Sequence, residues 1–292
     1  PHYELGLGTI PYYGEFLRSL VFDERIVYRD LFENDVFGVF ANSFFIDAGR
    51  TCDRYCDVIY AKCSYDRTIS NRMCTMIHTN QHVTKEAITN EAKQNIVNCK
   101  KNSDLINNRN CAHISAVHVE VNDNAIDMPF IGEMTLLRKI LNSISERNIN
   151  AVEELFNIYY LAILESSEII MDSNLYGPIM SEVYVEMTLS NCFIDSNNRI
   201  ITFDLEKVKK NGPANYLIYR AVEHLEGLTA LYGYEYDFQS IKEKYKLTPD
   251  ILDEYSSELE NYYKDIFVEE AIDPLRATQN TNEDIIKYNN II

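Results

Sequence analysis

The stretch "EMTLSNCFIDSNNRIITFDLE", residues 186–206, places a carboxylate, an amide and a second carboxylate at fixed intervals. Glu186 stands five residues before Asn191, and Asp204 stands thirteen residues after that amide. The apolar runs around "DSNN" predict short strands and a turn, so the three side chains can point into one cleft. Asn191 and Asp204 could hold Mg²⁺ there, because hard cations prefer oxygen ligands, although both residue types are also common in ordinary turns.

Composition and charge limit the classes of protein to which this chain can belong. The chain has 292 residues, of which 46% are apolar and 25% charged, which is typical of a globular protein that buries a sizeable core. No apolar run approaches the roughly 20 residues that span a bilayer, so we expect no membrane span. The formal charge of −18 would repel a phosphate backbone and argues against nucleic acid as a partner.

Seven cysteines, an odd number in a chain without a recognisable leader, favour reduced thiols and a cytoplasmic location. Four of them cluster within residues 52–74, at Cys52, Cys56, Cys63 and Cys74. Only the first two have the close spacing of a zinc knuckle, so buried thiols are favoured over a zinc site. The start at Pro1 suggests a segment of a longer protein.

The first half of the sequence is rich in predicted strands. Residues 34–48 and 57–65 carry Val, Ile, Phe and Tyr in short runs, and 113–131 reads as a strand hairpin that turns at "NDN". Between them, 84–102 has Thr84 as a candidate N-cap, an early acidic residue and apolar residues three and four apart, which predicts an amphipathic helix.

The second half is predominantly helical. Apolar spacing predicts helices over 135–147, 151–170 and the segment after Pro213, which Gly233 ends. The acidic stretch 250–273 predicts a further helix with a solvated face. We therefore expect an α+β chain of two lobes, a strand-rich N-lobe over 1–131 and a helical C-lobe over 132–292, with a cleft between them.

The spacing in 186–206 resembles the catalytic loop and metal-binding strand of the protein-kinase-like fold, in particular its small-molecule and sugar-kinase branches. Phosphoryl transfer needs metal ions on the phosphates, a cation opposite them and a carboxylate that orients the attacking hydroxyl. In that resemblance Glu186 is the catalytic carboxylate, and Asn191 and Asp204 hold Mg²⁺ beside ATP.

The same resemblance assigns nucleotide-binding residues to the first half. "VIYAK" at 58–62 looks like the third strand of a kinase N-lobe, which makes Lys62 the cation on the α- and β-phosphates. The helix at 84–102 would be the C-helix, with Glu91, or else Glu86, paired with Lys62. Without this context a strand lysine is more often a solvated edge residue.

Two further segments complete the implied nucleotide site. "MPFIGEMTL" looks like the passage between lobes in aminoglycoside-phosphotransferase-like kinases, where adenine would meet backbone groups of Phe130 and Ile131. The turn "FANSF" at 40–44, with Asn42 and Ser43, would cover the phosphates.

Over nearly its whole length the chain also resembles a kinase-like region found downstream of methyltransferase domains in bacterial surface-polysaccharide proteins. That resemblance implies a cytoplasmic setting, a sugar or lipid-linked glycan as acceptor, and a methyltransferase or glycosyltransferase as neighbour. The family has Asp where this chain has Glu186, and its "FDQEW" reads "FDLEK" at 203–207. These departures keep a second function open, a pseudokinase that binds or positions a glycan or a partner enzyme. A helical interaction protein unrelated to nucleotides is the third alternative.

Overall fold

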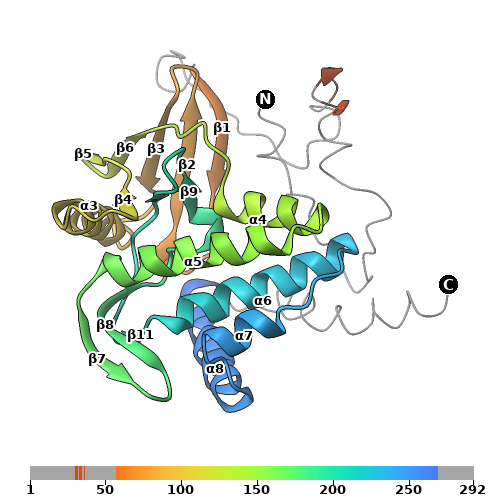
Figure 1. The fold of residues 1–292 in the computed structure, drawn as a ribbon. Coiled ribbons are helices and arrows are strands. Elements are labelled where there is room, and N and C mark those ends of the chain that lie inside the picture. The colour runs from red at the N-terminus through yellow and green to blue at the C-terminus, as the bar shows by residue number, and fades with distance from the viewer. Residues whose placement is uncertain (1–29, 32, 35, 37–56, 269–292) are drawn as a thin grey trace, which may run out of the picture.

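The computed structural model describes residues 30, 31, 33, 34, 36 and 57–268. This part of the chain has an α+β fold, in which strands dominate the first half and long helices the second (Figure 1). The predicted fold class is therefore confirmed. Within residues 57–268, no helix combines the length and the apolar character that a bilayer crossing requires.

The largest sheet is antiparallel and has the strand order β1-β2-β3-β6-β5. Its strands are β1 (Val58–Cys63), β2 (Met73–His78), β3 (His82–Ala87), β5 (Glu120–Asn122) and β6 (Ala125–Pro129). The first three strands follow one another as a meander, and β6 then pairs with β3. The strand β3 thus lies in the middle of the sheet, and it is also the last strand before a long helix.

That helix, α3 (Lys93–Asn108), packs its apolar residues against one face of the sheet. Because successive strand residues point to opposite faces, Lys85 lies on the same face of β3 as the buried Ala87. The apolar cluster on this face consists of Met73, Ala87, Ala92, Ile96, Cys99, Val117, Val119, Ile126 and Met128. Lys85 therefore points toward the interior of the molecule and not to solvent.

A small second sheet carries the stretch that we identified first. Its strands are β4 (Ile114–Ala116), β9 (Cys192–Ile194) and β10 (Ile200–Thr202), in the order β4-β10-β9. The antiparallel pairing of β9 with β10 brings the start of β9 next to the end of β10, with Cys192 opposite Thr202. Asn191 directly precedes β9 and Asp204 follows β10 by two residues, so the hairpin puts them at the same end.

The helices and a third sheet surround the larger core. The helices are α4 (Leu136–Ser145), α5 (Ile149–Ser166), α6 (Asn215–Tyr232), α7 (Gln239–Lys244) and α8 (Pro249–Ile266). The third sheet has the order β11-β8-β7, with β7 (Ile169–Ser173), β8 (Gly177–Tyr184) and β11 (Val208–Pro213). Short 3-10 turns, η2 (Ile69–Asn71) and η3 (Leu189–Asn191), precede β2 and β9.

The predicted helix over 84–102 is wrong in its first part. Residues 82–87 form β3, and the helix begins only at Lys93 and continues to Asn108. A helix start was suggested by Thr84 and Glu86, but β3 makes backbone ladders with both β2 and β6. Those two ladders, together with the β-branched Val83 and Thr84, outweigh the local helix signal.

Other predicted elements are close to those observed. The hairpin within 113–131 turns at Asp123, whose φ is +55°, and α6 ends at Gly233, whose φ is +67°. The helix over 151–170 ends earlier than predicted, at Ser166, and strand β7 follows it. The predicted phosphate-covering turn at 40–44, with Asn42 and Ser43, lies outside the described residues.

Two of the clustered cysteines form a disulfide, contrary to the prediction of reduced thiols. The register of β1 and β2 sets Cys63 directly opposite Cys74, with 4.1 Å between their Cα atoms, and the two are bonded. Cys99, Cys111 and Cys192 are free, while Cys52 and Cys56 are not among the described residues. Within the described ranges, no group of three or more His, Cys, Asp or Glu residues is arranged to hold a metal.

Candidate active site

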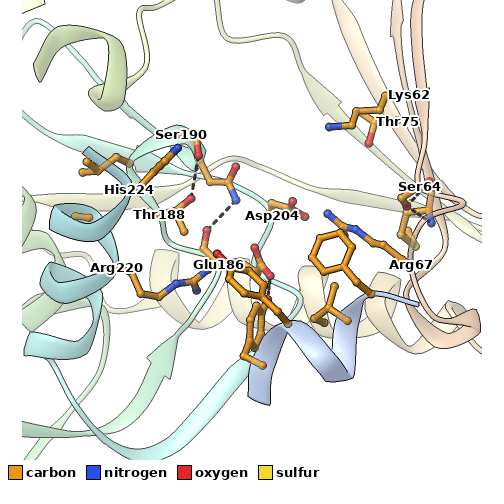
Figure 2. Close-up of a pocket in the computed structure, with 18 of the residues that line it drawn as sticks. Lys62, Ser64, Arg67, Thr75, Glu186, Thr188, Ser190, Asp204, Arg220 and His224 are labelled. Atoms are coloured by element: carbon orange, nitrogen blue, oxygen red, sulfur yellow. Dashed lines mark hydrogen bonds between the residues drawn. The ribbon is translucent and has the colours of Figure 1, made fainter. Parts of the chain in front are cut away.

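A cavity of about 400 Å³ lies where the large sheet meets the β9–β10 hairpin, α6 and the end of α8. Glu186, Asn191 and Asp204 all line it, as the spacing of the first stretch suggested. Figure 2 shows the labelled side chains of Glu186 and Asp204 on one side of this space and those of Lys62 and Thr75 on the other. The cavity therefore contains groups from both halves of the described chain.

At the inner end of the cavity, one ammonium group contacts two carboxylates. The Lys85 Nζ forms ion pairs with Asp204 Oδ1 and Glu206 Oε1, and the side chains of Lys85 and Glu206 are only 7% and 4% exposed. Burial opposes the charge on Lys85, but the two carboxylates more than offset it and raise its pKa. Lys85 is therefore a fixed positive charge in the interior.

The two carboxylates respond to this environment in opposite directions. Burial favours the neutral acid at Asp204, but the adjacent Lys85 ammonium outweighs it and holds the pKa of Asp204 below its usual range. Burial raises the pKa of Glu206, and Lys85 offsets that effect only in part. Lys85 thus favours the ionised form of Asp204, which is also the carboxylate of the pair that lines the cavity.

The backbone around Asp204 is held by amide side chains of α3. The Nδ2 of Asn102 donates to Leu205 O at 2.7 Å, and the Nδ2 of Asn98 donates to Glu206 O at 3.3 Å. Asp204 itself has a φ of +62°, in the left-handed region that non-glycine residues seldom occupy. Such a conformation persists only where the surroundings over-determine it, and it is found most often at functional sites.

Asn191 is oriented by the residues around it. Its Nδ2 donates to Glu186 O at 2.8 Å, and its own carbonyl accepts from Phe203 N at 3.1 Å. The amide nitrogen is therefore engaged, which leaves the Oδ1 of Asn191 as the acceptor for the cavity. Together with the Asp204 carboxylate it offers the hard oxygen donors that suit Mg²⁺, so these residues fit such an ion.

Glu186 lies beside these groups with a carboxyl that ionises near neutrality. Burial and the neighbouring Asp204 raise its pKa to about 7, although Arg220 opposes this shift. The backbone on either side is anchored, because Tyr159 donates to Met187 O at 2.6 Å and Arg220 donates to Val185 O. The Tyr262 hydroxyl, from α8, donates to Glu186 Oε1. A carboxylate poised near pH 7 is suited to accept a proton.

Lys62 lines the same cavity from strand β1, and its predicted contact with the nucleotide phosphates stays a prediction. It is exposed on β1 and pairs in register with Thr75 of β2, which in turn pairs with Lys85 of β3. Of the described strands, β3 is the one that directly precedes the long helix. Lys85 of β3 is the buried lysine of this cavity, and the sequence analysis missed it because it read this strand as a helix start.

Neither of the predicted partners of Lys62 lies in helix α3. Glu91 is exposed and precedes the first residue of α3, while Glu86 lies on β3 and accepts a hydrogen bond from Asn124. The sequence of α3, "KQNIVNCKKNSDLINN", contains no glutamate. Within the described residues Glu206 pairs with Lys85, and its signal was present in the sequence as the second acid of "FDLE".

Phe130 and Ile131 directly follow β6 and do not line the cavity of Figure 2. The Phe130 N–H donates to Gln81 O at 3.0 Å, and Ile131 packs against the cluster on the α3 side of the sheet. Val83, Ile201 and Phe203 pack against that same cluster. This placement sets apolar side chains of β3 and β10 near the end of β6. The predicted adenine contact of Phe130 and Ile131 stays a prediction.

The loop between β1 and β2, residues 64–72, borders the cavity through Ser64 and Arg67. It is tied to the end of α8, since Thr68 N donates to Ile266 O at 2.8 Å and Val268 N donates to Asp66 O at 3.0 Å. Its sequence, "SYDRTISNR", has no glycine. Any cover that it gives to a bound phosphate therefore depends on side chains such as Arg67 and not on close backbone approach.

No protein-family model matches the chain, and no curated protein matches it either. Among solved structures, the streptomycin–ATP–APH(2″)-IIa ternary complex matches with 11% identity and a TM-score of 0.40, over 75% of this chain and 92% of its own. The GDP and kanamycin complex of APH(2″)-IIia matches with 11% identity and a TM-score of 0.39, over 77% and 94%. Macrolide 2′-phosphotransferase type I matches with 10% identity and a TM-score of 0.33, over 68% and 90%. The similarity is partial and concerns the path of the backbone.

Proposed function

We propose that this protein is an ATP- and magnesium-dependent phosphotransferase that acts on a hydroxyl group. The observation that carries the proposal is the set of charged and polar groups in one cavity: Lys85 is paired with Asp204, and Glu186 and Asn191 line the same space. This set matches what phosphoryl transfer requires, namely a cation for the phosphates, oxygen ligands for a metal and a carboxylate for the attacking hydroxyl.

The parts of the cavity divide between the two substrates. Lys85, with Lys62 at the rim, would contact the nucleotide phosphates, and Asp204 and Asn191 would hold Mg²⁺ against them. When bound, the metal ion neutralises the charge on the phosphate oxygens. Glu186 would accept the proton of the acceptor hydroxyl, because its pKa of about 7 keeps a substantial fraction ionised at neutral pH.

The acceptor that we propose is a hydroxyl of a small molecule or of a sugar or lipid-linked glycan. The sequence resemblance to kinase-like regions of surface-polysaccharide proteins supports this choice, and it also supports a cytoplasmic setting beside a methyltransferase or glycosyltransferase. The two-lobed division, with the N-lobe over 1–131 and the C-lobe over 132–292, belongs to the same proposal.

A pseudokinase is the second candidate, and one contact favours it. The Tyr262 hydroxyl already donates to Glu186, so the carboxylate that would receive an acceptor is occupied in this structure. In that reading the protein binds nucleotide or positions a glycan or partner enzyme without transfer. Glu186 therefore separates the two candidates.

Transfer of labelled γ-phosphate from ATP to a panel of sugars and lipid-linked glycans tests the proposal. We expect Glu186→Gln to bind ATP and to lose transfer, whereas Glu186→Asp keeps or increases transfer because the shorter carboxylate is the one found in the resembling family. If the wild type and Glu186→Asp both bind ATP and transfer nothing to any acceptor, the pseudokinase is the better description.

A further inference from the structure

The Tyr262 hydroxyl occupies the position that the hydroxyl of a phosphoryl acceptor would need. Its hydroxyl donates to Glu186 Oε1, which is the contact that a hydroxyl must make with its general base before it attacks. The residue lines the same cavity as Lys85 and Asp204. The chain thus already places one of its own hydroxyl groups on the candidate base.

Tyr262 is held in this position by the end of α8. Beyond the tyrosine, Arg67 and Phe267 form a backbone bridge, and Thr68 N donates to Ile266 O at 2.8 Å. These bonds fix the last turn of α8 against the loop that borders the cavity. Tyr262 is therefore an ordered part of the site.

Two arginines line the cavity together with the tyrosine, and one of them lies over its ring. The Arg220 guanidinium lies 5.1 Å from the centre of the Tyr262 ring, and Arg67 lies over Phe267 at 5.8 Å. Figure 2 shows Arg67 and Arg220 reaching into the cavity from opposite sides, toward Glu186 and Asp204. Neither arginine forms an ion pair with a carboxylate of the described residues. A phosphate group on Tyr262 would have the Arg220 guanidinium beside it and Arg67 in the same cavity, and guanidinium donors stabilise phosphorylated side chains.

We propose that Tyr262 is an internal phosphoryl acceptor, so that the protein phosphorylates itself at this residue. The proposal rests on the proposed function, because it uses the same base and the same nucleotide site. In the step, the Tyr262 hydroxyl proton passes to the Glu186 carboxylate, and the phenolic oxygen forms a bond to the γ-phosphorus of ATP. The bond between that phosphorus and the bridging oxygen breaks, and ADP leaves with the electron pair.

Two features distinguish this reaction from phosphorylation of another molecule. The acceptor belongs to the same chain as the base, so the rate constant is independent of protein concentration. One phosphoryl group is added per chain, because Tyr262 then carries no further hydroxyl and its phosphate occupies the acceptor position.

The test is to incubate the full chain with ATP and Mg²⁺, measure its intact mass and map the modified peptide. We expect the added mass of one phosphoryl group, located at Tyr262, with a rate constant unchanged by dilution. Tyr262→Phe and Glu186→Gln should each lose the modification, whereas Tyr263→Phe, the adjacent tyrosine of the same helix, should keep it. Phosphate at another residue, or a rate constant that falls on dilution, would overturn the proposal.

Two measurements separate this proposal from the function on which it rests. Titration calorimetry with Mg²⁺ and ATP reports nucleotide binding in the wild type and in Tyr262→Phe. Binding without phosphate on Tyr262 overturns the internal acceptor alone, and absence of binding overturns both. Without nucleotide, Tyr262→Phe should raise the pKa of the Glu186 carboxyl, measured by NMR titration, because a donor to its ionised form is lost. An unchanged pKa would contradict the contact itself.

Discussion

At the residue scale, Lys85 connects the stability of the protein with its proposed chemistry. Its ammonium group pairs with Asp204 and with Glu206, and the side chains of Lys85 and Glu206 are almost fully buried. Removing one partner of a buried ion pair leaves an uncompensated charge, which is far more costly than loss of a surface pair. Lys62 offers a natural comparison, because it lines the same cavity from an exposed position.

We expect Lys85→Met to lower the free energy of unfolding by about 3 kcal/mol, because Asp204 and Glu206 then lack their cation. Lys62→Met should change it by less than about 0.5 kcal/mol, as is usual for an exposed side chain. Urea denaturation of the two variants beside the wild type measures both effects. Equal losses for the two lysines would contradict the assignment of Lys85 as the buried partner.

The raised pKa of Glu186 leads to a prediction about how the free energy of unfolding depends on pH. Its pKa is about 7 in the folded chain against the ordinary value of 4.5, so between these values the native state binds more protons than the unfolded state. Wild-type stability should therefore fall as the pH rises through this window, by on the order of 2 kcal/mol.

The glutamine side chain of Glu186→Gln cannot ionise, so this variant should not lose stability through this window as the pH rises. We expect the variant to gain stability relative to the wild type between pH 5 and pH 8, as measured by urea denaturation at a series of pH values. A stability difference that stays constant over this range would show that Glu186 titrates at its ordinary pKa.

At the element scale, the structure shows why one part of the site could be predicted and another could not. The spacing of Glu186, Asn191 and Asp204 is local to one loop and hairpin, so the sequence alone indicated that they meet. The environment of Lys85 depends on β3 pairing with β2 and β6, and β6 lies about 40 residues later in the chain. Local helix signals at Thr84 and Glu86 concealed that strand, and with it the buried lysine.

The third sheet and α6 meet at a glycine that gives an element-scale prediction. Gly177, at the start of β8, has a φ of +73°, and a Cβ added there would lie 2.8 Å from the Nδ2 of Asn215. That Nδ2 donates to Tyr245 O at 2.7 Å, so it cannot move aside without losing a buried hydrogen bond. Gly233 has a φ of +67° but nothing within 4 Å of such a Cβ.

We expect Gly233→Ala to cost about 1 kcal/mol of stability, the strain of a left-handed alanine. Gly177→Ala should cost at least about 1 kcal/mol more, because it adds steric conflict and a broken hydrogen bond to the same strain. Thermal unfolding of the two variants provides the comparison. A smaller loss of stability for Gly177→Ala than for Gly233→Ala would contradict the close packing of β8 against Asn215.

At the scale of the whole molecule, the α+β class and the helices α4, α5, α6 and α8 followed from apolar periodicity, because these helices are long and strongly patterned. The third sheet and the strands β2 and β3 were missed, because short strands carry little pattern of their own. The disulfide did not follow, since it depends on the register that sets Cys63 opposite Cys74. Glu206, the second acid that pairs with the buried Lys85, was also missed. Glu206 reaches Lys85 from a backbone segment that Asn98 and Asn102 of α3 hold by hydrogen bonds, and such long-range contacts are not visible in the sequence.

The central claim is that Asp204 and its neighbours form a magnesium-dependent nucleotide site. Asp204→Asn is the sharpest variant, because asparagine tolerates the left-handed backbone at this position while a neutral amide binds a hard cation poorly. Asp253→Asn, at an exposed residue of α8, makes the same change of charge away from the cavity and serves as its control.

Titration calorimetry of ATP with and without Mg²⁺ tests this claim most directly. We expect the wild type and Asp253→Asn to bind ATP in the presence of Mg²⁺, and Asp204→Asn to bind it at least roughly tenfold more weakly, a loss of about 1.4 kcal/mol. No binding heat for the wild type at millimolar ATP would contradict the nucleotide site. Equal affinities for the wild type and Asp204→Asn would contradict the role of Asp204.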